Sequence, residues 1–587
     1  MDYKTYDTEA AYYVYKKGFF MDDFCSDYIY SDEYFSFLVK YDNDMNRVDD
    51  IFNPACVSRI NNRFLVAYTK PASMNINEIL KYGYASIPKC YGLMDSDVLQ
   101  VIGADRIRNL PGLGFAGEGV LIGFVDTGID FISDAFRNPD GTTRISSIWD
   151  QNQEVYGQGA SAYGYGAIFT EEKINEALAS DNPYNIVPSL DEDGHGTFIA
   201  SVAAGSEGIS PKSDIIMVKL KQAKSFLRQF YLIPDEVNCY SEDDIMFAIK
   251  YLVEQAAVLG KPLVICLGIG TNQGGHTGNT YIETYLNAIT QLRGIGVCVS
   301  AGNETGFGTH FHASEVSGDS EDMEISVGSN DKGFTLELWG KAPGILNVSV
   351  ISPTGEVFGN ISAVKSTTYS RTFLYEGTTV YVETTVVEGT TGDPMVLFRF
   401  ENPTEGVWII RVKGEGSTAQ LGFDAWLPIH GFNNSDTKFV SPSPDTTICS
   451  PGNARGIITV AGYDYRTNAI YVNSSRGYTR MDGIKPDIAA PAVDVQGVFA
   501  RRMDGLTSGG LYIRRSGTSI ASAVTAGGIA LILQWAVVEN NYIDVTNESI
   551  KRILMTGARR TTGMAYPNRQ WGYGAIDLYE SFNALRR

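Results

Sequence analysis

Residues 120–130 read VLIGFVDTGID, and this short stretch decides the fold class. From Val120 to Val125 every residue is apolar or glycine, a pattern typical of a strand that is buried on both faces. An acidic residue, Asp126, ends the run. In open parallel sheets, ligand-binding and catalytic residues gather at the carboxyl ends of strands, so Asp126 stands where chemistry is expected.

Similar apolar runs follow along the chain and alternate with helical stretches. The strand-like runs are Val120–Val125, Ile215–Leu220, Leu263–Leu267 and Val297–Ser300, and the helical stretches are Thr197–Ala204, Asp243–Leu259 and Tyr281–Leu292. Strands that are apolar throughout and alternate with helices predict an α/β fold, with a parallel sheet and helices on both of its faces.

The pattern changes after Asn303. From about residue 324 to 423, polar and apolar residues alternate and turn residues recur, as in FTLELW at 334–339. This pattern predicts an antiparallel β-sandwich or jelly roll. The α/β pattern resumes with GIITV at 456–460, so we expect the β unit to be inserted within the α/β domain.

A small α+β unit is predicted to precede the α/β domain. Strand-like runs at 35–41 and 55–68 flank a short helix at 45–52, and a further helix is predicted at 74–82 with Ser73 as its N-cap. We therefore divide the chain into an N-terminal segment with this unit at 1–94, two parts of the α/β domain at 95–312 and 446–587, and the inserted β domain at 313–445.

Charge and hydropathy exclude several classes of partner. The formal net charge of -21 favours solubility and argues against binding to the phosphate backbone of nucleic acids. We find no stretch with the roughly 18 apolar residues of a membrane span, and the N-terminal residues do not resemble a secretory signal. We therefore expect no nucleic-acid partner and no membrane partner.

The seven cysteines are widely spaced and contain no C-x-x-C pair. Their odd number and spacing argue against a disulfide framework and against a zinc site, so we expect free thiols and a reducing compartment. His310 and His312 form an H-x-H pair, but no further ligands lie nearby in the sequence. We therefore assign no metal site.

His195 lies in DEDGHGTFIASVAAG at 191–205. The glycines at 194 and 196 allow a partner to approach the backbone closely, and the helix expected from Thr197 places the imidazole near a helix N-terminus. A single histidine beside an apolar helix is more often a core residue than a catalytic one, so this motif gains weight only from its companions.

Ser519 lies in RRSGTSIASAVTAGGIALIL at 514–533, at the expected start of an apolar helix. A serine there presents its Oγ and its backbone N–H to one point, which suits a nucleophile with a stabilised oxyanion. Taken alone, a helix-capping serine explains the residue better. Asn303, in VSAGNETG at 299–306, follows an apolar strand and can donate its side-chain amide to an oxyanion.

The four residues follow one another as Asp126, His195, Asn303 and Ser519, and the triad members have the Asp–His–Ser order of subtilisin. The motifs DTGID, DGHGTFIAS, SAGNETG and SGTSIASA each resemble a subtilase motif, as does KPDIAAPAV at 485–493. The resemblance covers about 92–309 and 446–587. It implies a subtilisin-like fold and a serine endopeptidase with Asp126, His195 and Ser519 as the triad and Asn303 as the oxyanion donor.

The resemblance also implies a groove that binds a polypeptide substrate as an extended strand. IIMVKL at 215–220 and CLGIG at 266–270 resemble its edges, and the implied substrate-binding residues are Leu220, Cys266, Leu267, Gly268, Ser300, Ala301 and Gly302. The chain departs from the family at Ala523, where a proline is usual, and at Cys266, where a serine is common. No cofactor is required; many subtilases bind structural calcium, but its ligands cannot be placed in this sequence.

The N-terminal unit, the FRNPDGTTRISSIWDQ stretch at 136–151 and the insert together resemble the germination-specific subtilases of clostridia. That resemblance implies a propeptide that stays in the groove as an inhibitor, and we expect self-cleavage within residues 91–97. It also implies a substrate such as a pro-enzyme activated during spore germination, and a cytoplasmic or spore-associated location. The alternative is a pseudoprotease or sensor that keeps the fold for binding; the intact triad argues against it.

Overall fold

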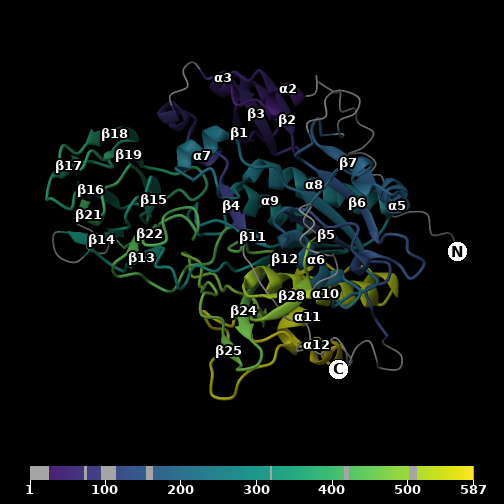
Figure 1. Cartoon of the computed structure of the whole chain (residues 1–587). Helices are drawn as coiled ribbons and strands as arrows, with labels where there is room; N and C mark the ends of the chain where they lie inside the picture. The colour runs from purple at the N-terminus through teal and green to yellow at the C-terminus, as the bar shows by residue number, and fades with distance from the viewer. Residues whose placement is uncertain are drawn as a thin grey trace.

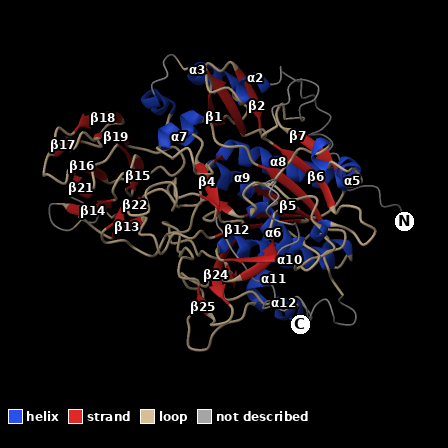
Figure 2. Ribbon diagram, viewed as in Figure 1, coloured by secondary structure: helices blue, strands red, loops and turns tan. Residues whose placement is uncertain are grey.

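The computed structural model describes residues 25–71, 76–93, 114–153, 161, 163–316, 320–415, 422–500 and 512–585. Figure 1 shows three units: a small N-terminal α+β unit, an α/β body, and a β insert that projects from one side of the body. Figure 2 shows that helices and strands alternate in the body, whereas strands and loops make up the insert.

The body is built on a nine-stranded sheet. Its order is β25-β24-β12-β10-β5-β8-β6-β7, and β26 pairs with β24. All neighbours from β6 to β26 are parallel, and only the edge strands β7 and β25 are antiparallel, which confirms the predicted parallel sheet. The bounds are β5 Leu121–Asp126, β6 Ile145–Asp150, β7 Ala167–Thr170, β8 Asp214–Lys219, β10 Leu263–Leu267, β12 Ile295–Ser300, β24 Ile458–Asp464, β25 Ala469–Ile470 and β26 Ile488–Pro491.

Helices cover both faces of this sheet. One face packs against α6 (His195–Ala204), α10 (Thr518–Leu533) and α11 (Asn547–Gly557), and the other against α8 (Glu242–Leu259) and α9 (Tyr281–Ile289). The shorter helices are α5 Glu171–Leu178, α7 Ser225–Tyr231 and α12 Leu578–Ala584.

Helix α10 is buried along its whole length. Contrary to our expectation from the sequence, the segment Thr518–Val538 is long and apolar enough to cross a membrane. However, 89% of its apolar window is buried inside the protein, as in the core helix of a folded domain.

The N-terminal unit contains a three-stranded antiparallel sheet in the order β1-β3-β2, with α3 (Met45–Phe52) between β1 and β2 in the chain. The strands are β1 Phe35–Lys40, β2 Cys56–Arg59 and β3 Phe64–Thr69. The helix predicted at 74–82 is a 3₁₀ helix at Ile76–Tyr82, and its predicted cap Ser73 lies outside the described residues.

Our expectation that every cysteine is free was wrong. Cys25 and Cys56 form a disulfide, with their Cα atoms 5.8 Å apart. The fold brings Cys25, just before the short helix α2 (Ser26–Ile29), against β2, and the 31-residue spacing gave no sign of this. The argument from unpaired thiols to a reducing compartment therefore rests only on the five remaining cysteines.

The insert is an antiparallel β-sandwich, as predicted. Its sheets have the orders β13-β22-β15-β20-β19-β18 and β17-β16-β21-β14-β23, and all strand pairs in them are antiparallel. The strands are β13 His310–Ala313, β14 Glu321–Val327, β15 Gly333–Trp339, β16 Ile345–Ile351, β17 Val357–Ile361, β18 Thr367–Thr372, β19 Thr379–Thr385, β20 Met395–Glu401, β21 Gly406–Glu415, β22 Phe423–Trp426 and β23 Lys438–Phe439.

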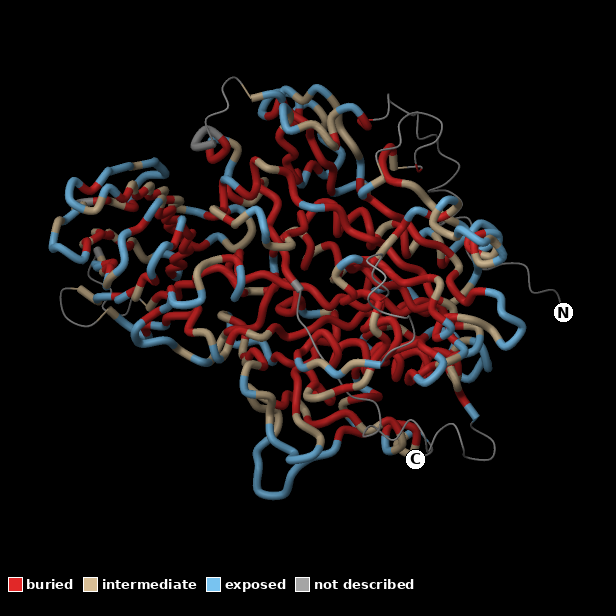
Figure 3. The backbone as a smooth tube through the Cα atoms, viewed as in Figure 1, coloured by how far each residue is buried: buried red, intermediate tan, exposed pale blue. Residues whose placement is uncertain are grey.

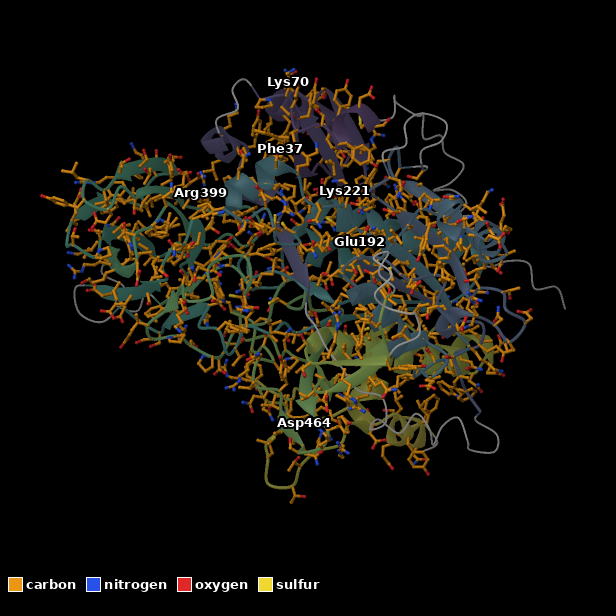
Figure 4. The ribbon with its side chains drawn as sticks, viewed as in Figure 1. Phe37, Lys70, Glu192, Lys221, Arg399 and Asp464 are labelled. Carbon is orange, nitrogen blue, oxygen red and sulfur yellow. A yellow bond between two sulfur atoms is a disulfide. The ribbon has the colours of Figure 1, made fainter. Side chains whose placement is uncertain are left out.

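One apolar core, which we call the shared core, joins all three units, and Figure 3 shows continuous buried backbone where they meet. Its members include Phe35, Phe37, Leu65, Ile87 and Cys90 of the N-terminal unit, Phe226, Tyr231, Cys239 and Cys449 of the body, and Trp339, Leu397 and Trp426 of the insert. Arg399 of the insert reinforces this junction, because its guanidinium lies 5.3 Å from the ring of Phe230 in α7 and 5.2 Å from the ring of Tyr381. Figure 4 labels Phe37 and Arg399 in this region.

Candidate active site

Three side chains far apart in the sequence meet at the carboxyl edge of the sheet. Asp126 ends β5, His195 begins α6, and Ser519 lies in the first turn of α10. Nδ1 of His195 is 2.7 Å from Oδ1 of Asp126, and Nε2 is 3.1 Å from Oγ of Ser519. Each of the three residues is at most 1% exposed.

The hydrogen bonds fix the tautomer of His195. Because Nδ1 faces a carboxylate oxygen, it carries the proton, and Nε2 is left to accept the hydroxyl proton of Ser519. The N–H of Thr127 also donates to Oδ1 of Asp126, at 2.8 Å, and holds that carboxylate in place. The arrangement suits a general base poised beside a nucleophile.

Asp191 anchors the helix that carries His195, a role that the sequence analysis missed. Its carboxylate accepts hydrogen bonds from the backbone N–H groups of Gly194 and Thr197 and from the hydroxyls of Thr127 and Thr197. It thereby pairs the free N–H groups at the start of α6 and links them to the loop after Asp126. An acidic residue four positions before the histidine was the only signal in the sequence.

Asn303 lies next to the start of α10. Its Oδ1 accepts the N–H of Thr518 at 3.0 Å, which leaves its NH₂ group as the free end of the amide. Gly302, at φ 104°, donates its N–H to the hydroxyl of Thr518 at 3.1 Å. These bonds tie the Asn303 loop to the residue before Ser519, so the amide and the helix N-terminus form one donor group.

A second, three-stranded sheet lies beside these residues, in the order β11-β4-β9. Its central strand β4 (Cys90–Leu93) comes from the N-terminal unit, while β9 (Tyr240–Ser241) and β11 (Ile269–Gly270) come from the body. The pairing is antiparallel on both sides, with Gly92 opposite Gly270 and Tyr91 opposite Tyr240. The end of the N-terminal unit therefore occupies a groove between two body strands.

Gly268 lies between this groove and two of the three catalytic candidates, Ser519 and His195. A Cβ on Gly268 would lie 3.0 Å from Cβ of Ser519 and 3.2 Å from Cε1 of His195. Leu220 lines a cleft of about 330 Å³ together with Thr127, Asp193 and Tyr240. Glu192, labelled in Figure 4, lines the same cleft and pairs with Lys219 at 2.7 Å.

Burial raises the pKa of Asp193 in this cleft, although the nearby His195 acts in the opposite direction. The side-chain amide of Asn238 donates to the Asp193 carboxylate at 2.9 Å. The cleft therefore presents a largely polar wall next to Asp126, in contrast to the apolar cores below it.

Other expected groove residues are not at its surface. Cys266 is buried beneath α10, with its thiol 3.7 Å from Oγ of Ser522, and Leu267 packs in the core on the opposite face of the sheet. Our placement of these two side chains in the substrate pocket is therefore not supported. Ser300 and Ala301 are buried at the end of β12 and beyond it, and only the next residue, Gly302, reaches the start of α10.

The H-x-H pair links two neighbouring strands of the insert, β13 and β22. Nε2 of His310 and Nδ1 of His312 lie 3.0 and 2.7 Å from the same Asp424 oxygen. Within the described ranges, no group of three or more His, Cys, Asp or Glu side chains is arranged to hold a metal ion.

The model of the subtilase family matches residues 117–396 and 432–574. The chain belongs to the subtilase family. This membership confirms the resemblance drawn from the four motifs and the α/β fold that it implied.

Individual subtilases match over different extents. The structure of the Clostridium perfringens CspB protease is 30% identical with a TM-score of 0.72, and the match covers 82% of this chain and 98% of that one. Subtilisin-like protease SBT3.4 of Arabidopsis thaliana is 25% identical over an alignment of 491 residues, and the match covers 73% of this chain and 58% of the relative. Serine protease AprX of Bacillus subtilis is 36% identical over 151 residues, 24% of this chain and 32% of the relative. The chain thus spans little more than half the length of the plant subtilase.

Proposed function

We propose that this subtilase is a serine endopeptidase that uses Asp126, His195 and Ser519. His195 Nε2 takes the proton of the Ser519 hydroxyl while Oγ attacks the scissile carbonyl, and Asp126 stabilises the imidazolium that forms. The Asn303 amide and the Ser519 backbone N–H hold the oxyanion. His195 then protonates the leaving amine, and water releases the acyl group from Ser519.

The observation that carries the proposal is the strand β4. An extended segment of the protein's own chain pairs with β9 and β11 immediately beside the Ser519–His195 pair. Backbone pairing on both sides is how a groove binds polypeptides of varied sequence. The polypeptide substrates of a subtilase would enter this same groove.

The pairing also suggests where the chain cleaves itself. Leu93, the last described residue of β4, lies opposite Ile269. Ile269 directly follows Gly268, where an added Cβ would lie 3.0 Å from Cβ of Ser519. The next residue in the sequence is Met94, which lies outside the described residues. We therefore propose Met94–Asp95 as the scissile bond, within the expected range of 91–97.

The N-terminal unit is proposed to remain bound as an inhibitor after this cleavage. Lys224, just before α7, donates from its Nζ to the carbonyls of Tyr28, Ser31 and Tyr34 at 2.7, 3.0 and 3.0 Å. The Tyr84 hydroxyl also donates to the buried carboxylate of Glu337 in the insert. These bonds and the shared core do not depend on the Met94–Asp95 bond being intact.

The test is to purify the full chain and its Ser519→Ala variant. Mass spectrometry should find two fragments that divide after Met94 in the wild type and one intact chain in the variant. A fluorophosphonate probe, applied after the N-terminal unit is displaced with urea and the body refolded, should label Ser519 only in the wild type. An intact, unlabelled wild type would support the alternative, a pseudoprotease that keeps the fold for binding.

We further propose that the natural substrate is a pro-enzyme activated during spore germination, in a cytoplasmic or spore-associated setting. The support is the sequence resemblance to the germination-specific subtilases and the match to the CspB protease along nearly its whole length. Substrate profiling with a peptide library, against Ser519→Ala as background, would first define the cleavage preference. A preferred sequence absent from the host's germination pro-enzymes would contradict this assignment.

A further inference from the structure

Two of the five free cysteines lie on opposite sides of the boundary between the N-terminal unit and the body. Cys90 begins β4, and Cys239 directly precedes β9, the body strand that pairs with β4. Both residues are 0% exposed and belong to the shared core. The other three thiols, Cys266, Cys298 and Cys449, all belong to the body.

The register brings the two thiols together. Cys90 pairs with Ser241, so Cys239, two residues away, is its diagonal neighbour on the same face of the sheet. The two thiols lie close enough for Cys239 to help raise the pKa of Cys90. Both backbones are held in place, because the N–H of Cys90 donates to Gln273 at 2.8 Å and the N–H of Cys239 donates to Gln222 at 3.1 Å.

We propose that Cys90 and Cys239 are a disulfide site that ties the N-terminal unit covalently to the edge of the substrate groove. The bond itself needs no proteolysis. Its consequence rests on the proposed function: once the chain is cut after β4, this disulfide converts a noncovalently held inhibitor into a cross-linked one. Reduction of the bond would then be required before the groove can open.

The oxidant is a low-molecular-weight disulfide such as glutathione disulfide. One protein thiolate attacks it, releases one glutathione thiolate and forms a mixed disulfide. The second protein thiolate attacks the protein sulfur of that mixed disulfide and releases the second glutathione. Two protein thiols are oxidised, one glutathione disulfide is reduced to two glutathiones, and the S–S bond between positions 90 and 239 is the product.

The geometry makes this bond slow to form and slow to break. Burial raises the pKa of the Cys90 thiol, so the reactive thiolate is scarce while β4 is seated. Diagonal partners have Cα atoms about 7–8 Å apart, whereas disulfides span roughly 4.4–6.8 Å, so the strands must approach by about an ångström. Exchange therefore occurs when the edge of the groove opens transiently, and the closed bond is shielded from reductants.

The decisive experiment uses the intact Ser519→Ala chain, so that its result does not depend on proteolysis. The protein is equilibrated in glutathione redox buffers, its thiols are blocked under denaturing conditions, and tryptic peptides are mapped without reduction. We expect a linked peptide that joins Cys90 to Cys239, and a fall from five free thiols to three. The Cys90→Ser and Cys239→Ser variants should each lose the link, whereas Cys449→Ser, a buried control in the same core, should keep it.

Five free thiols under conditions that preserve Cys25–Cys56, or a pairing of Cys266 with Cys298 alone, would overturn the proposal. The mapping of the parent chain decides this even if a serine variant fails to fold. Gel electrophoresis of the wild type distinguishes the proposed disulfide from the proposed self-cleavage. If the wild type runs as one band without reductant and as two bands with reductant, the chain is cleaved and its fragments are joined by the disulfide. If it runs as one band under both conditions while peptide mapping finds the Cys90–Cys239 link, only the proposed self-cleavage is refuted.

Discussion

Oδ2 of Asp191 accepts hydrogen bonds from both the N–H and the hydroxyl of Thr197, at 2.8 and 2.6 Å. Asp191→Asn would replace one acceptor oxygen with a donor and leave buried groups at the start of α6 unpaired. We expect kcat on a peptide substrate to fall roughly 10- to 100-fold, because His195 moves with the helix. The exposed Asp181→Asn variant is the control, and equal activity in both variants would show that Asp191 does not position His195.

Gly268→Ala tests how close the groove strand lies to the nucleophile. A Cβ there would meet Ser519 at 3.0 Å and His195 at 3.2 Å, so one of these side chains must shift. We expect the rate of fluorophosphonate labelling of Ser519 to fall by roughly 100-fold with little change in thermal stability. Gly359→Ala, where a Cβ meets only ordinary contacts in the insert, should label at the wild-type rate. Unchanged labelling of Gly268→Ala would refute the proposed contact.

Asn303→Ala removes the side-chain donor of the proposed oxyanion site. In subtilisin itself, loss of such a donor lowers kcat by about 10²–10³-fold. We expect the same range here with little change in KM, because the amide acts on charge that develops only in the transition state. Steady-state kinetics on a peptide substrate measure this, with the exposed Asn182→Ala as control. A rise in KM alone would assign Asn303 to substrate binding.

Lys224→Met tests the attachment of the N-terminal unit. The substitution keeps most of the apolar side chain but leaves the carbonyls of Tyr28, Ser31 and Tyr34 without their donor. Each buried polar group that loses its partner costs about 1–3 kcal/mol, so the processed unit should be released at a lower urea concentration. Gel filtration in urea follows the release. Lys212→Met, at a 62% exposed lysine, should behave as the wild type.

His312 and Asp424 should make the stability of the insert depend on pH. The hydrogen bond to Asp424 raises the pKa of His312. Burial acts to raise the pKa of Asp424, but its bonds to His310 and His312 outweigh this and hold it well below its usual value. The His312 contribution is therefore complete below about pH 6.5 and is lost as pH rises through the raised pKa. The Asp424 contribution is present above about pH 4 and is lost as pH falls through the lowered pKa.

His312→Ala should accordingly lower the free energy of unfolding by about 0.5–1 kcal/mol at pH 6, because its side chain is half exposed. At pH 9 the variant and the wild type should unfold at the same urea concentration. Urea titrations at the two pH values make the comparison, and a larger effect at pH 9 would reverse the assigned sign.

The sequence predicted the elements whose patterns are long and regular. The strands β5, β8, β10 and β12 are apolar except at their ends, and the sandwich strands alternate, so the parallel sheet and the sandwich could both be inferred. The groove strands β9 and β11 have only two residues each, too short for any period to appear. They exist because β4 supplies the pairing partner from a distant part of the chain.

Cys266 shows why the position of a side chain was harder to predict from the sequence than the position of a helix or strand. Cys266 and Gly268 are two residues apart and lie on the same side of the sheet, below α10. Cys266 lies under α10 near Ser522, whereas Gly268 lies beside the first turn of α10, next to Ser519. The motif CLGIG alone does not show where along the strand the helix begins. The partner of Cys25 was similarly invisible, because spacing does not specify which strands become neighbours.

The shared core separates cleavage of the backbone from release of the N-terminal unit. Aromatic and aliphatic side chains from the N-terminal unit, the body and the insert pack together in one interior, which a single backbone cut at its edge would leave in place. Maturation would then alter the connectivity of the chain while its shape persists. Whatever switches the enzyme on must supply the work of separating surfaces that fold together.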